Sequence, residues 1–275
     1  MSSSATIPHS DIELTRDGAG DKAIVFMHGF LDDQHVWNPV IANLTAPEYE
    51  IVRLDLAGFG QRSEATGPFT FDRFAADLSA AVDAVDKPFV LVGHSMAAPI
   101  VELVAVGRPD RALGLLLVSP IPMAGTRLPD EAFESFRSLG ELGAVDYRAF
   151  RQQVAPLAPE AELERLVAVA ANFRAEVVRS VADAWNDGYP AAERPSGFTG
   201  PVLALRGTND PLLTAEIVAA RVAERFDPTR TKVIAIEESG HWPHIERPSA
   251  VAAAINRFLA DDLATRVTSP VASNG

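Results

Sequence analysis

A serine lies where a short apolar strand is expected to turn into a helix. Residues 92–97 have the sequence VGHSMA and continue the apolar run at 89–92. A Gly-x-Ser-x-Gly turn between a strand and a helix exposes the serine hydroxyl as a nucleophile, and small flanking residues avoid a clash with the strand. Gly93 keeps the first glycine of this pattern, and Ala97 replaces the second. The pattern predicts Ser95 as a nucleophile, although a buried serine in an ordinary strand–helix turn is the alternative.

The base that would activate this serine is expected after the last apolar run. A serine hydroxyl becomes a useful nucleophile when an imidazole accepts its proton. Residues 232–236 form that run, and His241 and His244 follow it in the stretch SGHWPH. We predict His241 as the base because it is nearer the run and follows the flexible Gly240, and His244 is the alternative. The other histidines fit less well, because they lie in the N-terminal segment, in a turn, in a helix or beside the serine: His9, His28, His35 and His94.

The acid that would orient the imidazole is expected after another strand. Asp210 follows the apolar run at 202–205 in the stretch RGTNDP, and Asp55 follows an earlier run at 50–54. Either carboxylate could accept the imidazole N–H and stabilise the imidazolium, while Asp-Pro is also an ordinary turn pair. The order serine, aspartate, histidine along the chain, each after an apolar run, is typical of one hydrolase class and favours Asp210.

The two backbone donors that would hold an oxyanion are expected in two turns. The stretch MHGFL at 27–31 follows the apolar run at 23–27, and its Gly29 lets the chain approach a ligand closely. We predict that the N–H of Phe30 and the N–H of Met96, the residue after the nucleophile, form an oxyanion hole. A plain strand–helix turn is the alternative for 27–31.

Composition excludes several other classes of function. The 275 residues contain no cysteine, which excludes disulfides, a thiol nucleophile and thiolate metal sites. The pair His241 and His244 could bind a metal, but no third ligand is apparent, so neither a metal nor another cofactor is expected. The formal net charge of −13 disfavours nucleic acids and anionic membranes as partners. Residues 1–10 lack the apolar run of a secretory signal, and no stretch is long enough to span a bilayer, so we expect a soluble cytoplasmic protein.

Short apolar runs alternate with helical patterns along most of the chain. The runs lie at 23–27, 50–54, 89–92, 113–118, 202–205 and 232–236, and helices are expected near 34–46, 71–85, 96–107, 214–226 and 248–262. This alternation predicts an α/β protein with a doubly wound, mostly parallel sheet. Residues 12–14, with a turn at 17–20, are expected to add an antiparallel edge hairpin, and the tail after Leu263 is expected to fray.

The region between the fourth and fifth runs contains no convincing strand. Amphipathic stretches lie near 130–139, 144–154, 160–171 and 174–186. One crossover between parallel strands needs one helix, so four helices predict an all-helical lid over the carboxyl edge of the sheet, although plain crossover helices are the alternative. The expected organisation is a core at 1–121 and 199–275 with the lid at 122–198.

Together these stretches resemble the α/β-hydrolase fold superfamily. The resemblance covers residues 22–258 and is carried by HGF at 28–30 with Trp37, DLAGFG at 55–60, GHSMA at 93–97, GTNDP at 207–211, and GHWPH at 240–244 with Glu246 and Pro248. It implies Ser95 as nucleophile, Asp210 as acid, His241 as base and the amides of Phe30 and Met96 as the oxyanion hole. The serine at the turn argues against epoxide hydrolases and haloalkane dehalogenases, which carry aspartate there. The stretch FLDD at 30–33 replaces the Gly-Pro-Gly usual in C–C hydrolases, and the sequence is most similar to small esterases, lactonases and cofactor-free perhydrolases.

The expected reaction is hydrolysis of a small to medium, largely apolar carboxylic ester or lactone through an acyl-enzyme. Few basic residues attach to the expected site, so a strongly anionic substrate is not indicated. The alternatives are a C–C or C–N bond hydrolase or perhydrolase with the same triad, and a non-catalytic relative that binds a small ligand. The side chains expected to line the substrate pocket are apolar, although packing inside the lid would also explain them: Phe30, Met123, Phe133, Phe136 and Trp185.

Overall fold

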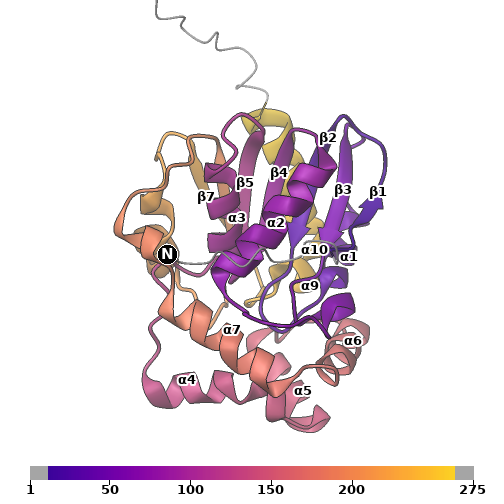
Figure 1. Ribbon diagram of the computed structural model, residues 1–275, viewed down its shortest axis with the longest axis vertical. Coiled ribbons are helices and arrows are strands. Elements are labelled where there is room, and N and C mark those ends of the chain that lie inside the picture. Colours follow the sequence, from indigo (N-terminus) through magenta and orange to yellow (C-terminus); the bar gives the residue numbers. More distant parts are fainter. Residues whose placement is uncertain (1–11, 264–275) are drawn as a thin grey trace, which may run out of the picture.

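A seven-stranded sheet forms the centre of the protein (Figure 1). The computed structural model describes residues 12–263, so the predictions for His9, for segment 1–10 and for the tail after Leu263 lie outside the described residues. The strand order is β1-β3-β2-β4-β5-β6-β7, and only the β1–β3 pair is antiparallel among the described strands. The strands are β1 (Thr15–Asp17), β2 (Lys22–Met27), β3 (Tyr49–Leu54), β4 (Phe89–His94), β5 (Ala112–Val118), β6 (Val202–Gly207) and β7 (Thr231–Ile236). The predicted doubly wound α/β class is confirmed.

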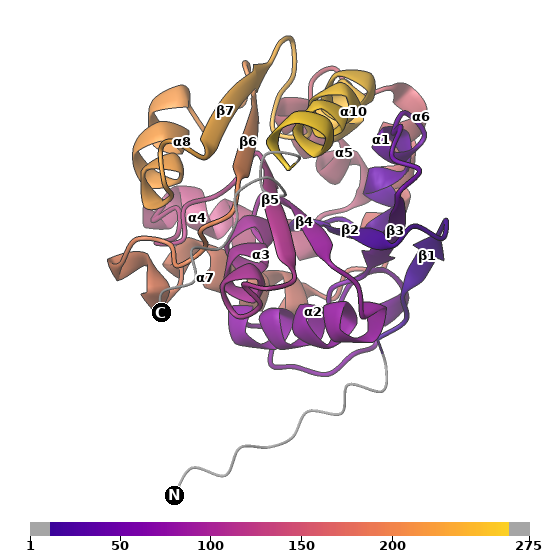
Figure 2. The same ribbon diagram turned by 90° about the horizontal axis from the view of Figure 1, so that it is seen from above.

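Helices cover both faces of this sheet, as near-continuous apolar strands require (Figure 2). Successive residues of β2 alternate between the two faces: Val25 and Met27 pack in one core with α2 and α3, whereas Ile24 and Phe26 pack in a second core with α10. The helices of the core are α1 (Asn38–Ile41), α2 (Phe71–Val85), α3 (Ala97–Val106), α8 (Ala215–Arg221), α9 (Pro243–Glu246) and α10 (Pro248–Arg257).

Four further helices lie between β5 and β6 in the chain and gather at one end of the sheet (Figure 1). They are α4 (Asp130–Arg137), α5 (Ala144–Val154), α6 (Glu160–Ala170) and α7 (Ala175–Asp187). The first turns of α4, α5, α6 and α7 all carry acidic side chains, which suit the positive end of a helix dipole. The boundaries at 122 and 198, and the role of these helices as a lid, stay predictions.

The structure differs from the expected elements at the N-terminal edge and in two helices. The predicted antiparallel edge strand is present, but it lies at Thr15–Asp17 and not at 12–14. It pairs with β3 and not with β2, the next strand along the chain, so the predicted hairpin is wrong. The helices expected at 34–46 and 214–226 are each broken into an α-helix and a tighter turn. At Val222 the backbone leaves the helical region, with φ −120°. Short helical turns complete the chain at Gln34–Trp37, Gly60–Arg62, Leu139–Glu141, Pro190–Glu193, Ala223–Arg225 and Phe258–Asp262. Over residues 12–263, the structure contains no helix that meets the length and apolarity needed to cross a membrane.

Candidate active site

Ser95 lies in the sharp turn that joins β4 to α3. Its φ of +52° lies in the left-handed region, where a non-glycine residue is strained by about 1–3 kcal/mol. The turn is held because the N–H of Ser95 donates to the carbonyl of Val118 at 2.8 Å. A Cβ on Gly93 would lie 2.8 Å from the carbonyl oxygen of Ala97, so a glycine is required at that position. The methyl group of Ala97 itself is fully buried at the start of α3, and the turn accommodates it.

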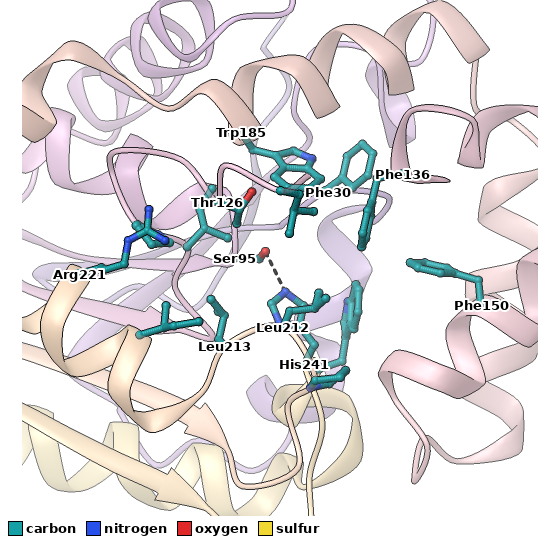
Figure 3. A pocket seen from close by; sticks show the side chains of 16 residues that line it. Phe30, Ser95, Thr126, Phe136, Phe150, Trp185, Leu212, Leu213, Arg221 and His241 are labelled. Carbon is teal, nitrogen blue, oxygen red and sulfur yellow. Dashed lines mark hydrogen bonds between the residues drawn. The ribbon is translucent and has the colours of Figure 1, made fainter. Parts of the chain in front are cut away.

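The hydroxyl of Ser95, the imidazole of His241 and the carboxylate of Asp210 form a chain of hydrogen bonds (Figure 3 shows the first two side chains). Nε2 of His241 lies 2.9 Å from Oγ of Ser95, and Nδ1 lies 2.7 Å from Oδ2 of Asp210. The three residues come from the ends of β4, β6 and β7, which are parallel strands whose carboxyl ends meet at one edge. The structure thus brings together the predicted nucleophile, base and acid.

The carboxylate of Asp210 is held in its charged form. Burial raises its pKa, but the His241 imidazole and the backbone N–H groups of Leu212 and Leu213 outweigh burial and lower it below the ordinary value. Both N–H groups donate to Oδ1, at 2.8 and 3.1 Å, so Oδ2 remains for the imidazole. Asp55, the alternative acid, has both oxygens engaged by backbone N–H groups of two loops: Oδ1 accepts the N–H of Gln34, and Oδ2 accepts the N–H of Gln61.

His28 orients the peptide unit that carries the first predicted oxyanion donor. Nε2 of His28 accepts the N–H of Leu56 at 3.0 Å, so the proton lies on Nδ1, which donates to the carbonyl of Gly29 at 2.8 Å. This carbonyl belongs to the same planar peptide as the N–H of Phe30 and points the opposite way, so His28 fixes the direction of that N–H. Within residues 12–263, no hydrogen bond joins the N–H of Phe30 or of Met96 to another residue. Both predicted donors are therefore left for a ligand.

The loop that carries His241 is held by three hydrogen bonds to its backbone. The N–H of His241 donates to the carbonyl of Val154, at the end of α5. The N–H of Gly240 donates to Oε2 of Glu246 at 2.7 Å, and Nε2 of His94 donates to the carbonyl of His241 at 2.9 Å. Burial lowers the pKa of His94, so its imidazole is neutral at neutral pH and acts here as a fixed support.

A buried ion pair lies behind this loop. Asp32 is fully buried and accepts hydrogen bonds from Nη2 of Arg151 and from Nε1 of Trp242, both at 2.9 Å. The guanidinium of Arg151 also stacks on the Trp242 ring, 4.5 Å from its centre. Burial raises the pKa of Asp32, but the Arg151 guanidinium outweighs burial and holds the pKa far below the ordinary value. Trp242, which follows His241 in sequence, is thereby held between Arg151 of α5 and Asp32 in the loop after β2.

One group of three possible metal ligands exists among the described residues. Ligand atoms of Asp32, His94 and His244 lie within 4.8 Å of one another. This group does not contain the pair His241 and His244 considered from the sequence, because the fold brings Asp32 and His94, and not His241, to His244. Both oxygens of Asp32 already accept hydrogen bonds, and the Arg151 cation opposes a metal ion beside them. The absence of a metal site stays a prediction.

An apolar pocket of ≈ 170 Å³ opens above Ser95 (Figure 3). Phe30, Phe136 and Trp185 line it, as the sequence predicts. Met123 and Phe133 do not line it, so the prediction for these two residues is wrong. Met123 is buried in the turn after β5, where its carbonyl accepts the N–H of Tyr189. Phe133 packs edge-on against Trp185, with 6.0 Å between the ring centres. Further lining residues that the sequence analysis missed include Ile121, Thr126, Phe150, Leu212, Leu213, Arg221 and Trp242.

The missed residues differ in how visible they are in sequence. Trp242 and Leu212 are one and two residues from the predicted base and acid, so proximity along the chain was a usable signal. Phe150 and Arg221 lie on α5 and α8, whose rotation about their own axes no local pattern gives. Asp32 follows the oxyanion turn, and its burial depends on Arg151, a residue 119 positions away.

Comparison with known proteins agrees with this architecture. The sequence model of the "Alpha/beta hydrolase family" matches residues 24–254. The chain is 25% identical to the "Probable esterase D14L" of Oryza sativa subsp. japonica over 90% of this chain and 95% of that protein. It is 28% identical to the "Pimeloyl-[acyl-carrier protein] methyl ester esterase" of Xanthomonas campestris pv. campestris over 86% of this chain and 95% of that protein.

A solved structure extends the similarity to the whole fold. A bromoperoxidase from Bacillus anthracis superposes with a TM-score of 0.80, at 20% identity, over 92% of this chain and 98% of its own. The strand order, the serine turn after β4 and the match over residues 24–254 lead to one assignment. The chain belongs to the alpha/beta hydrolase family.

Proposed function

We propose that the protein is a serine hydrolase that cleaves a small to medium, largely apolar carboxylic ester or lactone through an acyl-enzyme. The observation that carries this proposal is the chain of hydrogen bonds from Ser95 through His241 to Asp210, with the hydroxyl facing an apolar pocket. The two relatives named above are both called esterases, which supports the same class of reaction.

In the first half of the reaction, Oγ of Ser95 attacks the carbonyl carbon while Nε2 of His241 takes the hydroxyl proton. The carboxylate of Asp210 stabilises the imidazolium, and the N–H groups of Phe30 and Met96 hold the oxyanion. Loss of one such donor typically costs about 2.7–4 kcal/mol of activation free energy. The imidazolium then passes its proton to the alkoxide oxygen as the ester bond breaks, and the acyl group stays on Ser95.

In the second half, water replaces the departed alcohol. His241 removes a proton from the water, whose oxygen adds to the acyl carbon, and the oxyanion occupies the same two amides. When the intermediate collapses, the Ser95 oxygen leaves and recovers its proton from the imidazolium. One water is consumed: an ester gives one acid and one alcohol, and a lactone, whose alcohol oxygen stays attached to the acyl group, gives one hydroxy acid.

The pocket sets the size and polarity of the proposed substrate. An apolar cavity of about 150 Å³ is large enough to bind benzene, so the ≈ 170 Å³ above Ser95 suits a group of about six to eight non-hydrogen atoms. Helices α4, α5 and α7 each place an aromatic ring on its wall, namely Phe136, Phe150 and Trp185. We propose that residues 122–198 act as the lid that selects the substrate.

Hydrolysis of a short p-nitrophenyl ester by the Ser95→Ala variant tests this function. We expect turnover to fall to the uncatalysed background, because no other described side chain replaces the missing nucleophile beside His241. Labelling with a fluorophosphonate should modify the wild type at Ser95 and leave the variant unmodified.

The matched control is Ser119→Ala. Ser119 is also a buried serine with a positive φ, at the end of the neighbouring strand β5, and its hydroxyl has no hydrogen-bond partner among the described residues. The control variant should keep activity and labelling. Turnover that persists in Ser95→Ala, or a folded wild type that neither turns over esters nor accepts the label, would overturn the proposal and favour a small-ligand-binding role.

A further inference from the structure

Arg221 brings a permanent positive charge to the wall of the substrate pocket. It is the last residue of α8, and among the described residues that line this pocket it is the one arginine, with no lysine, aspartate or glutamate beside it. Figure 3 shows its guanidinium beside Thr126, with Ser95 between Arg221 and Phe150 in this view. The pocket therefore has one cationic side and one aromatic side, and the nucleophile lies between them.

The charge of Arg221 is not neutralised within the described part of the chain. One Nη2–H donates to the carbonyl of Gly125 at 2.7 Å, and no salt bridge joins the guanidinium to a carboxylate of residues 12–263. Two other arginines that are partly or fully buried are paired with carboxylates: Arg225 with Glu102 at 2.8 Å, and Arg151 with Asp32 at 2.9 Å. Arg221 is thus held in place by a neutral acceptor that leaves its charge free.

An unpaired guanidinium beside apolar walls favours a particular ligand chemistry. The planar fork of donors suits a carboxylate, and a charged hydrogen bond is roughly twice as strong as a neutral one. A neutral substrate that displaces water from this side gives the cation no compensating acceptor, whereas a carboxylate supplies one.

From this arrangement we infer that Arg221 is a specificity-determining residue that binds a carboxylate of the substrate. The substrate class is then a half-ester: an ester with one carboxylate at its far end, separated from the reacting carbonyl by a short apolar chain. This inference rests on the proposed esterase function and refines it. The scarcity of basic residues noted in the sequence holds for the pocket as a whole, but the fold delivers one arginine to it.

Two substrate pairs test the inference, because the carboxylate can be on either side of the ester bond. The acyl pair is mono-p-nitrophenyl adipate and p-nitrophenyl hexanoate, and the alcohol pair is the acetate of 6-hydroxyhexanoate and hexyl acetate. In at least one pair, Arg221→Gln should lower kcat/KM for the charged member about 10- to 100-fold, mainly through KM, and leave the neutral member nearly unchanged. Arg221→Lys, which keeps the charge but loses the fork, should recover part of the loss.

Arg230→Gln is the matched control. Arg230 is exposed and, like Arg221, donates to a backbone carbonyl, that of Thr199 at 3.2 Å, but it does not line the pocket. In each substrate pair, this variant should leave the ratio of kcat/KM for the charged member to kcat/KM for the neutral member unchanged. The inference is overturned if Arg221→Gln changes neither charged-to-neutral ratio, or if it lowers both members of each pair equally, as a structural role would. Failure of the esterase function itself is recognised separately, because the wild type would then turn over none of the four esters and would not react with a fluorophosphonate.

Discussion

Replacing Asp210 by asparagine tests whether the carboxylate fixes the protonated nitrogen of His241, because the variant keeps the imidazole but changes the group that faces Nδ1. Oδ1 of Asp210 accepts two N–H groups, from Leu212 and Leu213, and Oδ2 accepts Nδ1–H of His241. In Asp210→Asn the amide oxygen must face the two donors, so the NH₂ group faces Nδ1. Because NH₂ can only donate, Nδ1 must lack a proton, and the neutral ring then carries its proton on Nε2. An Nε2–H that faces the serine hydroxyl at 2.9 Å cannot accept its proton.

The expected loss follows from this change of tautomer. The same exchange in a serine protease lowers kcat about 10⁴-fold, which corresponds to about 5.5 kcal/mol of activation free energy. We expect kcat for a p-nitrophenyl ester to fall about 10³- to 10⁴-fold in Asp210→Asn, with KM and the melting temperature little changed, since the bonds to Leu212 and Leu213 persist. The nitrogen shifts of the His241 ring, measured by NMR, should report the switch from an Nδ1–H to an Nε2–H imidazole.

Asp227→Asn provides the control for a general effect of the exchange. Asp227 also accepts the N–H two residues ahead, that of Thr229 at 2.8 Å, but in an exposed turn. Its asparagine variant should keep full activity. The reasoning is refuted if Asp210→Asn retains more than about a tenth of the wild-type kcat, or if it loses activity while the His241 ring keeps its proton on Nδ1.

Two further predictions concern the ion pair behind the base and the aromatic side of the pocket. Asp32→Asn leaves the Arg151 charge buried without its counter-ion and should lower the free energy of unfolding by about 3–5 kcal/mol at pH 7. Because the folded-state pKa of Asp32 is lowered, the wild type holds this stability above the ordinary carboxyl pKa, begins to lose it as the pH falls below about 4, and loses it fully only near the lower folded-state pKa. Urea unfolding at pH 7 and pH 3.5 should therefore show a deficit that narrows in acid, and a constant deficit would contradict the assignment. Phe136→Ala removes a ring shared by the pocket and a second, more open cavity beside it, and should raise kcat/KM for a p-nitrophenyl decanoate several-fold relative to the butyrate. Phe133→Ala, on the same helix but not on the wall, should leave that chain-length ratio unchanged.

The strands and the triad could be predicted because they depend on chain order and on a simple geometric rule. An apolar run buried on both faces indicates a strand of a parallel sheet, and the residue just after it lies at the carboxyl edge. Ser95 and Asp210 follow buried runs, and His241 follows the apolar run of the half-exposed edge strand β7, so their proximity follows without knowledge of side-chain packing. The replacement of glycine by Ala97 does not disturb the turn, since the clash concerns a side chain at Gly93.

The features that could not be predicted depend on how helices are rotated and docked against the sheet. Phe133 and Phe136 are three residues apart and lie on the same side of α4, yet only Phe136 reaches the pocket, because Phe133 packs behind Trp185. Arg151 on α5 is likewise fully buried, although an arginine is usually exposed. Only the buried Asp32, brought from the β2 turn, makes a charge stable at that position. The pairing of β1 also depends on contacts between distant parts of the chain, because β2 and β3 have similar apolar sequences and either could have paired with it.

The helical insertion also holds the loop of His241 in place, in addition to the lid role proposed for it. The carbonyl of Val154, at the end of α5, accepts the N–H of His241, and the N–H of Leu157 donates to the Glu246 carboxylate that also binds Gly240. An opening of the insertion that displaced residues 154–157 would break these bonds and move the imidazole away from Ser95. Entry of substrate while His241 stays in place therefore requires movement of other parts, such as the pocket-lining rings Phe136 on α4 and Trp185 on α7. It follows that substitutions at the α5–α6 junction should change kcat, whereas those on the pocket side of α4 should change substrate choice.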